Sequence, residues 1–182
     1  MAVIEAIKTT YLEADGYIQW TSIPNTYKHL QIRGSFGDHN ATQSSTALFT
    51  ISGYVNNDNG YGFWATGTLY GKGSTATTHG STGWIQTGYC GAEPNIPSSA
   101  MCVMDIMDYS SANKKTVLTA RSGYVRNLNG INTVGMFSNV WHTATGSAST
   151  GINGAVDQIL INSPGGAGLI RGSCFTLYGI ND

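Results

Sequence analysis

The stretch that decides the fold is Met101–Thr119, which reads MCVMDIMDYSSANKKTVLT. Its first half alternates between two apolar sets: Cys102, Met104 and Ile106 on one side, and Met101, Val103 and Met107 on the other. Residues two apart point to the same face of a strand, so this segment has two largely apolar faces. Such a pattern is typical of a strand in the middle of a sheet that is covered on both sides.

The second half of this stretch predicts a hairpin. Asp108–Lys115 (DYSSANKK) is polar and rich in turn-forming side chains, so we expect it to be exposed. Val117–Ala120 then resumes an apolar pattern. The sequence therefore predicts a strand, an exposed connection and a second strand, placed at the centre of the fold.

The composition favours a single domain built of sheets and turns. The chain has 182 residues, which fits one domain. Charged residues make up 10% of it, against about 25% in an average soluble domain, and there are 24 glycines. We therefore expect many short strands separated by turns, and no long helix.

Charge and hydropathy argue against two classes of partner. The net charge is −1 and no basic cluster is visible, so we expect no nucleic-acid partner. No run approaches the ~20 apolar residues of a membrane helix, so we expect no membrane insertion. The start of the chain, MAVIEAIKTT, lacks the pattern of a signal peptide, and we expect synthesis in a cytoplasm without export by that route. The three cysteines, Cys90, Cys102 and Cys174, form an odd, unpatterned set that predicts buried free thiols.

The rest of the chain predicts an all-β fold. Further short strands are expected at Tyr17–Trp20, Leu30–Phe36, Ala47–Val55, Phe63–Tyr70, Trp84–Tyr89, Thr133–Val140, Ala155–Ile161 and Cys174–Tyr178. A short helix over residues 2–7 is left open. Many short strands bounded by turn clusters favour a single-domain β-sandwich. We favour a jelly roll over an immunoglobulin-like fold, because the length is generous for the latter and no Cys…Trp…Cys framework is present.

Two local patterns give more specific expectations. Asn56–Gly60 (NNDNG) is a dense turn signal, which predicts that Ala47–Val55 and Phe63–Tyr70 pair as a hairpin. Gly71–Gly83 and Thr143–Gly154 contain mainly small and polar residues. We expect these two segments to be exposed loops, because neither has enough apolar side chains to pack.

Motifs for cofactors and metals are absent. Gly71-Lys72-Gly73-Ser74 contains a Gly-Lys pair, but it meets neither the Walker nor the dinucleotide spacing. The four histidines, His29, His39, His79 and His142, include no closely spaced pair to begin a metal site. The clustered Asn57-Asp58-Asn59-Gly60 is more often a turn than a calcium loop. We expect no cofactor and no metal.

Hydrolytic chemistry is equally poorly supported. No G-x-S-x-G elbow is present. Asp105 and Asp108 are close in sequence, but three positions apart on a strand they point to opposite faces, unlike the facing carboxylates of a glycosidase. Asp105 is more simply interpreted as a structural carboxylate. Trp64, Trp84 and Trp141 offer flat faces for sugars, although aromatic side chains are also the ordinary filling of a sandwich core. We expect a protein that is not an enzyme.

Several phrases, taken in order, resemble a known class of protein. They are Ser22–Leu30 (SIPNTYKHL), Leu69–Ser74 (LYGKGS), Asp105–Thr116 (DIMDYSSANKKT), Asn139–Trp141 (NVW) and Gly172–Ile180 (GSCFTLYGI). This succession resembles the small virion structural proteins of tailed bacteriophages, including those of marine bacteria and cyanobacteria. The chain departs from the usual pattern in a long Gly146–Gly154 segment and in Cys174, where a small or polar residue is more usual.

The resemblance implies a non-enzymatic module on the outside of a phage particle that is assembled in the host cytoplasm. A capsid decoration or cement protein is favoured; the alternative is a tail-fibre or receptor-binding module that recognises host surface carbohydrate. Sparse charge and threefold assembly among phage jelly rolls together predict a homotrimer that also contacts other virion proteins. The partner-binding residues expected from the polar central segment are Asp108, Asn113, Lys114 and Lys115.

Overall fold

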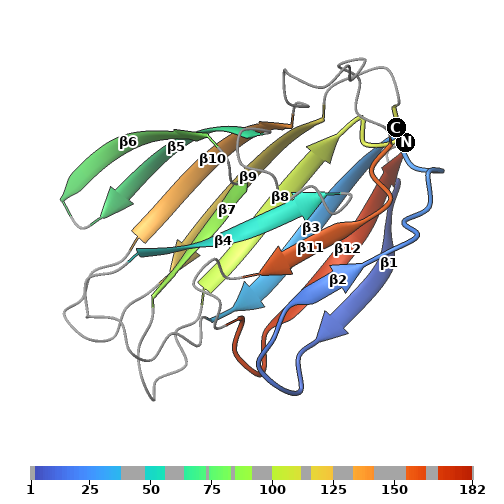
Figure 1. The fold of residues 1–182 in the computed structure, drawn as a ribbon, viewed down its shortest axis with the longest axis horizontal. Helices are drawn as coiled ribbons and strands as arrows, with labels where there is room; N and C mark the ends of the chain where they lie inside the picture. The colour runs from blue at the N-terminus through green and yellow to red at the C-terminus, as the bar shows by residue number, and fades with distance from the viewer. Residues whose placement is uncertain are drawn as a thin grey trace.

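The computed structural model describes most of the chain. It covers residues 3–37, 48–55, 64–72, 74–82, 85–91, 100–111, 116–124, 133–141, 155–162 and 168–181. These residues form strands, turns and irregular connections arranged as two packed sheets (Figure 1). All paired strands are antiparallel within the described residues.

The two sheets differ in width. The large sheet has eight strands, in the order β1 (Val3–Tyr11), β12 (Cys174–Asn181), β3 (His29–Phe36), β8 (Ala100–Met107), β9 (Val117–Tyr124), β10 (Thr133–Trp141), β5 (Trp64–Lys72) and β6 (Thr75–Thr82). The small sheet has four, in the order β2 (Ile18–Trp20), β11 (Ile159–Asn162), β4 (Leu48–Val55) and β7 (Ile85–Gly91). The small sheet lies across one face of the large one, where β7 contacts β8, β9 and β10.

The pairing pattern is that of a jelly roll. If the β5–β6 and β9–β10 pairs are set aside, the first four strands pair with the last four in reverse order: β1 with β12, β2 with β11, β3 with β8, and β4 with β7. These pairs alternate between the two sheets, as in a long hairpin rolled around a core. The predicted all-β, jelly-roll sandwich is therefore confirmed.

Two insertions widen one sheet of this jelly roll. The β5–β6 hairpin follows β4, and the β9–β10 hairpin follows β8. Because β9 pairs with β8 and β10 pairs with β5, both insertions extend the large sheet on the same side. The large sheet consequently projects beyond the strands that cover it (Figure 1).

The core lies between the two sheets. From β8 it receives Cys102, Met104 and Ile106, each at most 3% exposed. Other fully buried members include Ile18, Trp20, Leu30, Ile32, Ile161, Phe175 and Leu177. The indole nitrogen of Trp20 donates a hydrogen bond of 2.9 Å to Thr10 Oγ1, so the ring is buried with its polar group satisfied.

One glycine in the core is required by an aromatic ring. The Phe175 ring stacks on Phe36 at a centroid distance of 5.5 Å and lies directly on Gly34, its cross-strand neighbour. A Cβ at position 34 would overlap the Phe175 ring atoms. The absence of a side chain at Gly34 thus makes room for Phe175.

The central hairpin is confirmed, but its predicted environment is partly wrong. β8 and β9 pair from Ala100↔Tyr124 to Met107↔Val117 and occupy the middle of the large sheet. However, Met101 is 67% exposed and Met107 is 43% exposed. The expected cover on both sides is wrong because the small sheet packs on one face only, and alternation of apolar residues does not show how many layers a sheet has.

Three local predictions are also wrong. Ala47–Val55 and Phe63–Tyr70 correspond to β4 and β5, which lie in different sheets and do not pair as a hairpin. A turn signal indicates that the chain reverses, but not which strand it meets next. Much of the expected Gly71–Gly83 loop is the edge strand β6, whose threonines suit an exposed strand. The helix left open over residues 2–7 is replaced by β1, which begins at Val3.

Candidate functional site

Of the predicted partner-binding residues, Asp108 is the one within the described part of the chain. It follows β8 with a positive φ of 50°, a conformation that aspartate tolerates better than most residues. Its backbone N–H donates to His29 Nδ1 at 2.9 Å, and its carbonyl accepts from Ser111 N at 3.0 Å. Asn113, Lys114 and Lys115 lie outside the described residues. Asp108 is therefore a half-buried turn residue with structural contacts.

The residue after Asp108 corrects the expectation that this segment is wholly exposed. Tyr109 is 0% exposed, and its hydroxyl donates to the carbonyl of Pro24. Burial raises the pKa of the Tyr109 hydroxyl, an effect partly offset by a backbone hydrogen bond at Tyr27. Val156 N–H in turn donates to the Tyr109 carbonyl at 2.8 Å. The aromatic ring thus ties this turn to the body of the sandwich.

A larger candidate surface is the outer face of the large sheet, which points away from the small sheet. None of the described strands packs on it. Register places five aliphatic side chains on outward positions of β5, β8 and β10, with β9 lying between β8 and β10; they are Leu69, Met101, Val103, Val134 and Met136. Four of these are among the most exposed large hydrophobic side chains, at 50 to 67%. We call this set the apolar groove.

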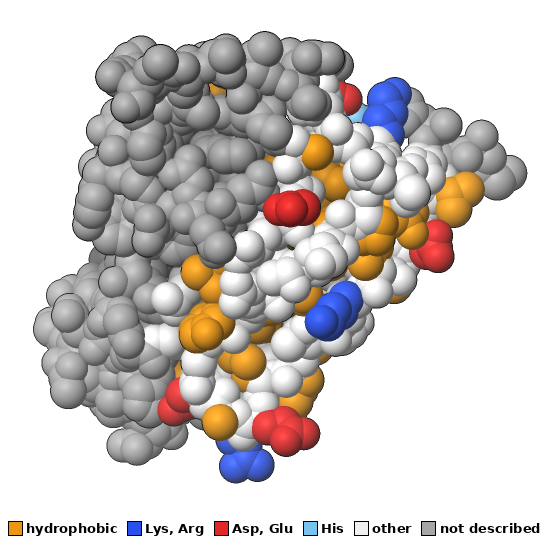
Figure 2. All heavy atoms as spheres, turned by 45° about the vertical axis from the view of Figure 1, so that its right-hand side comes forward, with side chains coloured by type: hydrophobic (Ala, Val, Ile, Leu, Met, Phe, Trp, Pro, Cys, Tyr) orange, Lys and Arg blue, Asp and Glu red, His pale blue; other side chains and the backbone are white. Residues whose placement is uncertain are grey.

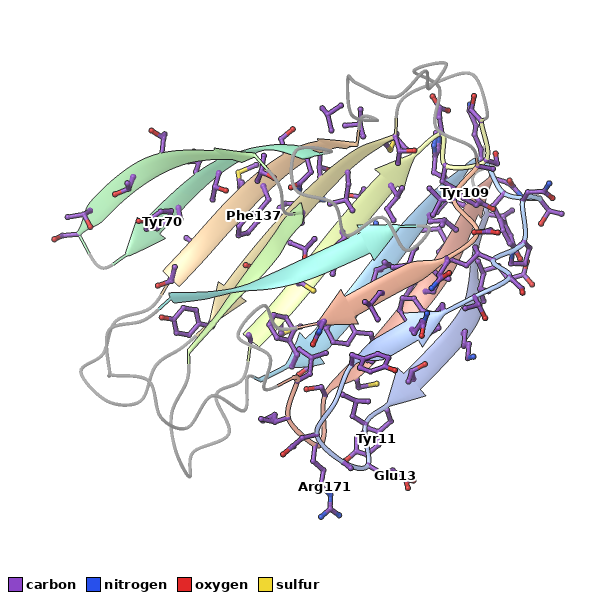
Figure 3. All side chains as sticks on the ribbon, in the orientation of Figure 1. Tyr11, Glu13, Tyr70, Tyr109, Phe137 and Arg171 are labelled. Carbon is purple, nitrogen blue, oxygen red and sulfur yellow. The ribbon has the colours of Figure 1, made fainter. Side chains whose placement is uncertain are left out.

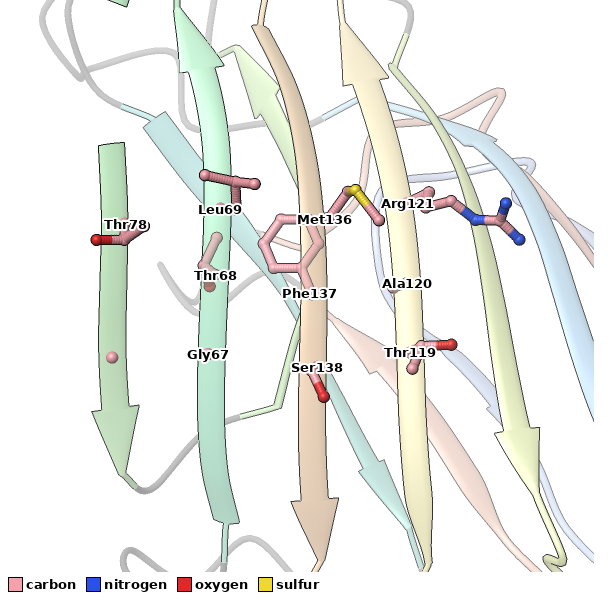
Figure 4. A pocket seen from close by; sticks show the side chains of 11 residues that line it. Gly67, Thr68, Leu69, Thr78, Thr119, Ala120, Arg121, Met136, Phe137 and Ser138 are labelled. Atoms are coloured by element: carbon pink, nitrogen blue, oxygen red, sulfur yellow. The ribbon is translucent and has the colours of Figure 1, made fainter. Parts of the chain in front are cut away.

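Glycines give the groove its depth. Gly71 and Gly123 flank Val134 in register, and Gly123 also pairs with Met101. Gly71 and Gly123 line a depression of about 890 Å³, and Gly67 and Gly80 line an adjoining depression of about 790 Å³. Both depressions are lined by Leu69, Arg121 and Met136, whose side chains lie on neighbouring strands in Figure 4. The result is one continuous open groove.

A cluster of charged side chains runs from within this groove to its edge: Arg121 lies between Met136 and Val103 in register, and Arg33 lies beside Val103 on the next strand. Arg121 Nη2 lies 3.4 Å from Asp105 Oδ2, and Gln31 Nε2 donates to Asp105 Oδ1 at 2.6 Å. Arg33 Nε donates to Gln31 Oε1 at 2.7 Å, and its guanidinium lies 4.9 Å from the centre of the Tyr178 ring. Asp105 is therefore an engaged structural carboxylate, as predicted, and the two arginines leave this cluster with an excess of positive charge.

The buried cysteine Cys102 offers little reactivity at this face. Burial raises the pKa of the Cys102 thiol to about 12, although a backbone hydrogen bond with Gly34 opposes the shift. A thiol that stays protonated is a poor nucleophile and a poor metal ligand. Cys102 and Cys174 are both free, as predicted, but Cys174 is half-buried rather than buried, which corrects that part of the expectation. The Cys90 side chain lies outside the described ones. Among the described residues no group of three or more His, Cys, Asp or Glu side chains is placed to hold a metal.

The structure does not describe the side chains of the three tryptophans considered for sugar stacking. Trp64, Trp84 and Trp141 have side chains outside the described set, although the backbones of Trp64 and Trp141 are cross-strand partners. Over the coloured part of the face in Figure 2, charged side chains are few, and hydrophobic ones lie among uncharged polar ones. This distribution agrees with the low charge of the chain.

Comparisons with known proteins identify no relative. No protein-family model, curated protein or solved structure matches the chain. Nor do the described residues include any helix long and apolar enough to cross a membrane. Function must therefore be argued from the surfaces of the molecule.

Sequence reasoning did not anticipate the apolar groove. Its signal was present in the alternation of Met101 and Val103 and of Val134 and Met136. The alternation at Met101 and Val103 was interpreted as a covered face, because periodicity does not distinguish a covered face from an open one. The groove became visible only when register brought the four strands together.

Proposed function

We propose that this chain is a non-enzymatic structural protein on the exterior of a bacteriophage particle, where it decorates and stabilises the capsid. The observation that carries the proposal is the widened jelly roll with its open outer face. A sheet face of exposed aliphatic side chains around a groove is a surface suited to protein contact. The succession of phrases resembling phage virion proteins gives the class of partner, and assembly would take place in the host cytoplasm.

The chemistry of this surface supports a binding role without catalysis. Side chains in the groove are aliphatic, and the carboxylate of Asp105 at its border is held by Gln31 and Arg121. The Cys102 thiol points into the core rather than toward the groove's open side. Such a surface contributes burial and a few directional contacts, as in a protein interface with an apolar centre and a polar rim.

We further propose that the protein assembles as a homotrimer and contacts other virion proteins. Exposed, sparsely charged sheet faces favour association because they gain free energy when covered. The segment from Asp108 to Lys115 remains the proposed contact with the shell. Its anchored first half, fixed by Tyr109, would present the following polar residues Asn113, Lys114 and Lys115.

A tail-fibre or receptor-binding role is the second candidate. It is favoured by Tyr11 and Tyr17, which are 59% and 57% exposed near the acidic residues Glu13 and Asp15. Exposed tyrosine rings beside carboxylates can stack on and hydrogen-bond to sugars. In that role this turn, rather than the groove, would meet the host surface.

Locating the protein in an image of the whole particle tests the proposal. Decoration predicts density for this fold at regular positions on the capsid shell. A second measurement is co-sedimentation of the purified protein with capsids that lack it. Density confined to the tail, or binding to host cells but not to capsids, would favour the second candidate. Absence of the protein from purified particles would overturn both.

A further inference from the structure

A second exposed surface lies at the end of the molecule away from Tyr109. It comprises Tyr11, the last residue of β1, and residues 12–17, which connect β1 to β2, and we call it the anchored turn. Besides Ala14, its exposed side chains are two tyrosines and two acids: Tyr11, Glu13, Asp15 and Tyr17. Figure 3 shows Tyr11 and Glu13 at this end, with Arg171 nearby, and Tyr109 at the opposite end.

The backbone of the anchored turn is held in place. Leu12 N–H donates to Ser173 O at 2.9 Å, and Gly172 N–H donates back to Leu12 O at 2.8 Å. Gly16 and Leu169 exchange two further backbone hydrogen bonds of 2.9 and 2.6 Å. These bonds fix the turn before any partner arrives, which lowers the entropy cost of binding.

The glycines opposite the turn make this anchoring possible. Gly168 has a φ of +82°, and a Cβ there would come within 2.7 Å of the Gly16 carbonyl oxygen. Gly172 has a φ of +92°. Asp15 Oδ1 also accepts a hydrogen bond of 2.7 Å from Arg171 N–H, which adds a side-chain tie. Rigid, exposed tyrosines of this kind are common anchors in protein interfaces.

We propose that the anchored turn of one copy of this chain binds in the apolar groove of the next copy. The groove provides aliphatic side chains with Arg121 among them and Arg33 at the edge, and the turn provides aromatic rings beside Glu13 and Asp15. Tyrosine rings pack on methionine and leucine side chains, and the arginines face the carboxylates. The inference rests on the proposed homotrimer and names its contact surfaces.

The occupant is a second copy because one chain carries both complementary surfaces. They lie on different parts of the molecule, so the contact is heterologous, and such contacts close into rings when the rotation permits. A ring of this kind makes one contact per subunit.

The first test is the mass in solution. The chain has a mass of 19.3 kDa, and light scattering at micromolar concentration should give three times that value. Met136→Glu places a charge in the groove and should give the monomer mass. Met107→Glu is the matched control on the same sheet face outside the groove, and it should remain assembled. A monomeric or dimeric wild type, or an assembled Met136→Glu variant, would overturn the inference.

The second test uses the heterologous character of the contact. A groove variant (Met136→Glu) retains an intact turn, and a turn variant (Tyr11→Ser with Tyr17→Ser) retains an intact groove. Mixed together, the two monomeric variants should form a complex of two chains and nothing larger, because one intact contact remains. A mixture that stays monomeric would show that the turn does not bind the groove.

Capsid binding separates this inference from the proposed function. If the wild type is monomeric and still binds capsids, the inference falls and the decoration role stands. If the protein forms the ring and neither capsids nor tails contain it, the proposed function falls and the contact between copies stands. Thermal unfolding of every variant identifies any loss of assembly that is due to misfolding.

Discussion

The two faces of β8 carry similar side chains and have different roles. On the inner face, Cys102, Met104 and Ile106 are at most 3% exposed and form the centre of the core. On the outer face, Met101 is 67% exposed and belongs to the apolar groove. Hydrophobicity alone is therefore a poor guide to stability here. The inner residues stabilise the fold, whereas the outer ones contribute free energy only when a partner covers them.

The sharpest comparison uses methionine on each face. Met104→Ala should reduce the free energy of unfolding by about 3 kcal/mol, because it removes buried contacts and leaves a cavity. Met101→Ala should change it by less than about 0.5 kcal/mol in the monomer. Urea unfolding of both variants, made in the monomeric Met136→Glu background, measures the difference. Equal losses would show that the outer face is covered within one chain.

Glycine substitutions allow the same comparison between the inner and outer faces of the large sheet. Gly34→Ala on the inner face should cost about 1–3 kcal/mol, since its methyl group would overlap the buried Phe175 ring. Gly123→Ala on the outer face would place its Cβ 3.6 Å from Val134 Cγ1, an ordinary contact. This second change should be neutral or stabilising by up to about 1 kcal/mol. A destabilised Gly123→Ala variant would contradict the described groove floor.

The buried thiol gives the inner face a pH dependence. Burial raises the pKa of Cys102 to about 12, from the ordinary value of 9.0. The unfolded chain therefore loses this proton first, and stability should fall as the pH rises from about 9 toward 12, by up to about 1.4 kcal/mol per pH unit. Cys102→Ala should flatten this part of the curve, and Met101→Ala should not. Urea unfolding between pH 8 and pH 11 makes the measurement.

The smallest expected effect concerns the turn after β8. Tyr109→Phe removes the hydroxyl that donates to the Pro24 carbonyl and should cost about 1 kcal/mol. The fold should persist, since the ring stays buried. Thermal unfolding would show a decrease of about 2–4 °C in Tm. An unchanged Tm would mean that the turn is not tied to the body of the sandwich through this bond.

The sequence predicted the positions of the strands better than it predicted which strands pair with each other. Alternation at Leu30–Phe36 and at Thr133–Val140 located β3 and β10 closely, because the period of two is a local property of the backbone. The pairing of β5 with β10, on the other hand, joins residues some seventy positions apart. The dense turn signal at Asn56–Gly60 suggested the nearer partner. Sheet order depends on how distant segments bury area together, which no local window records.

For the candidate surfaces, too, some features followed from the sequence and others only from the fold. By itself, the sequence determined that this protein is an all-β sandwich with little charge, because strand period and composition are local and additive properties. It also indicated that Asp105 is a structural carboxylate. Only the tertiary structure decided that Met101, Val134 and Met136 are open rather than buried and that Tyr109 is buried rather than open. Burial depends on which layer packs against a residue, and here a four-stranded sheet covers just one face of an eight-stranded one.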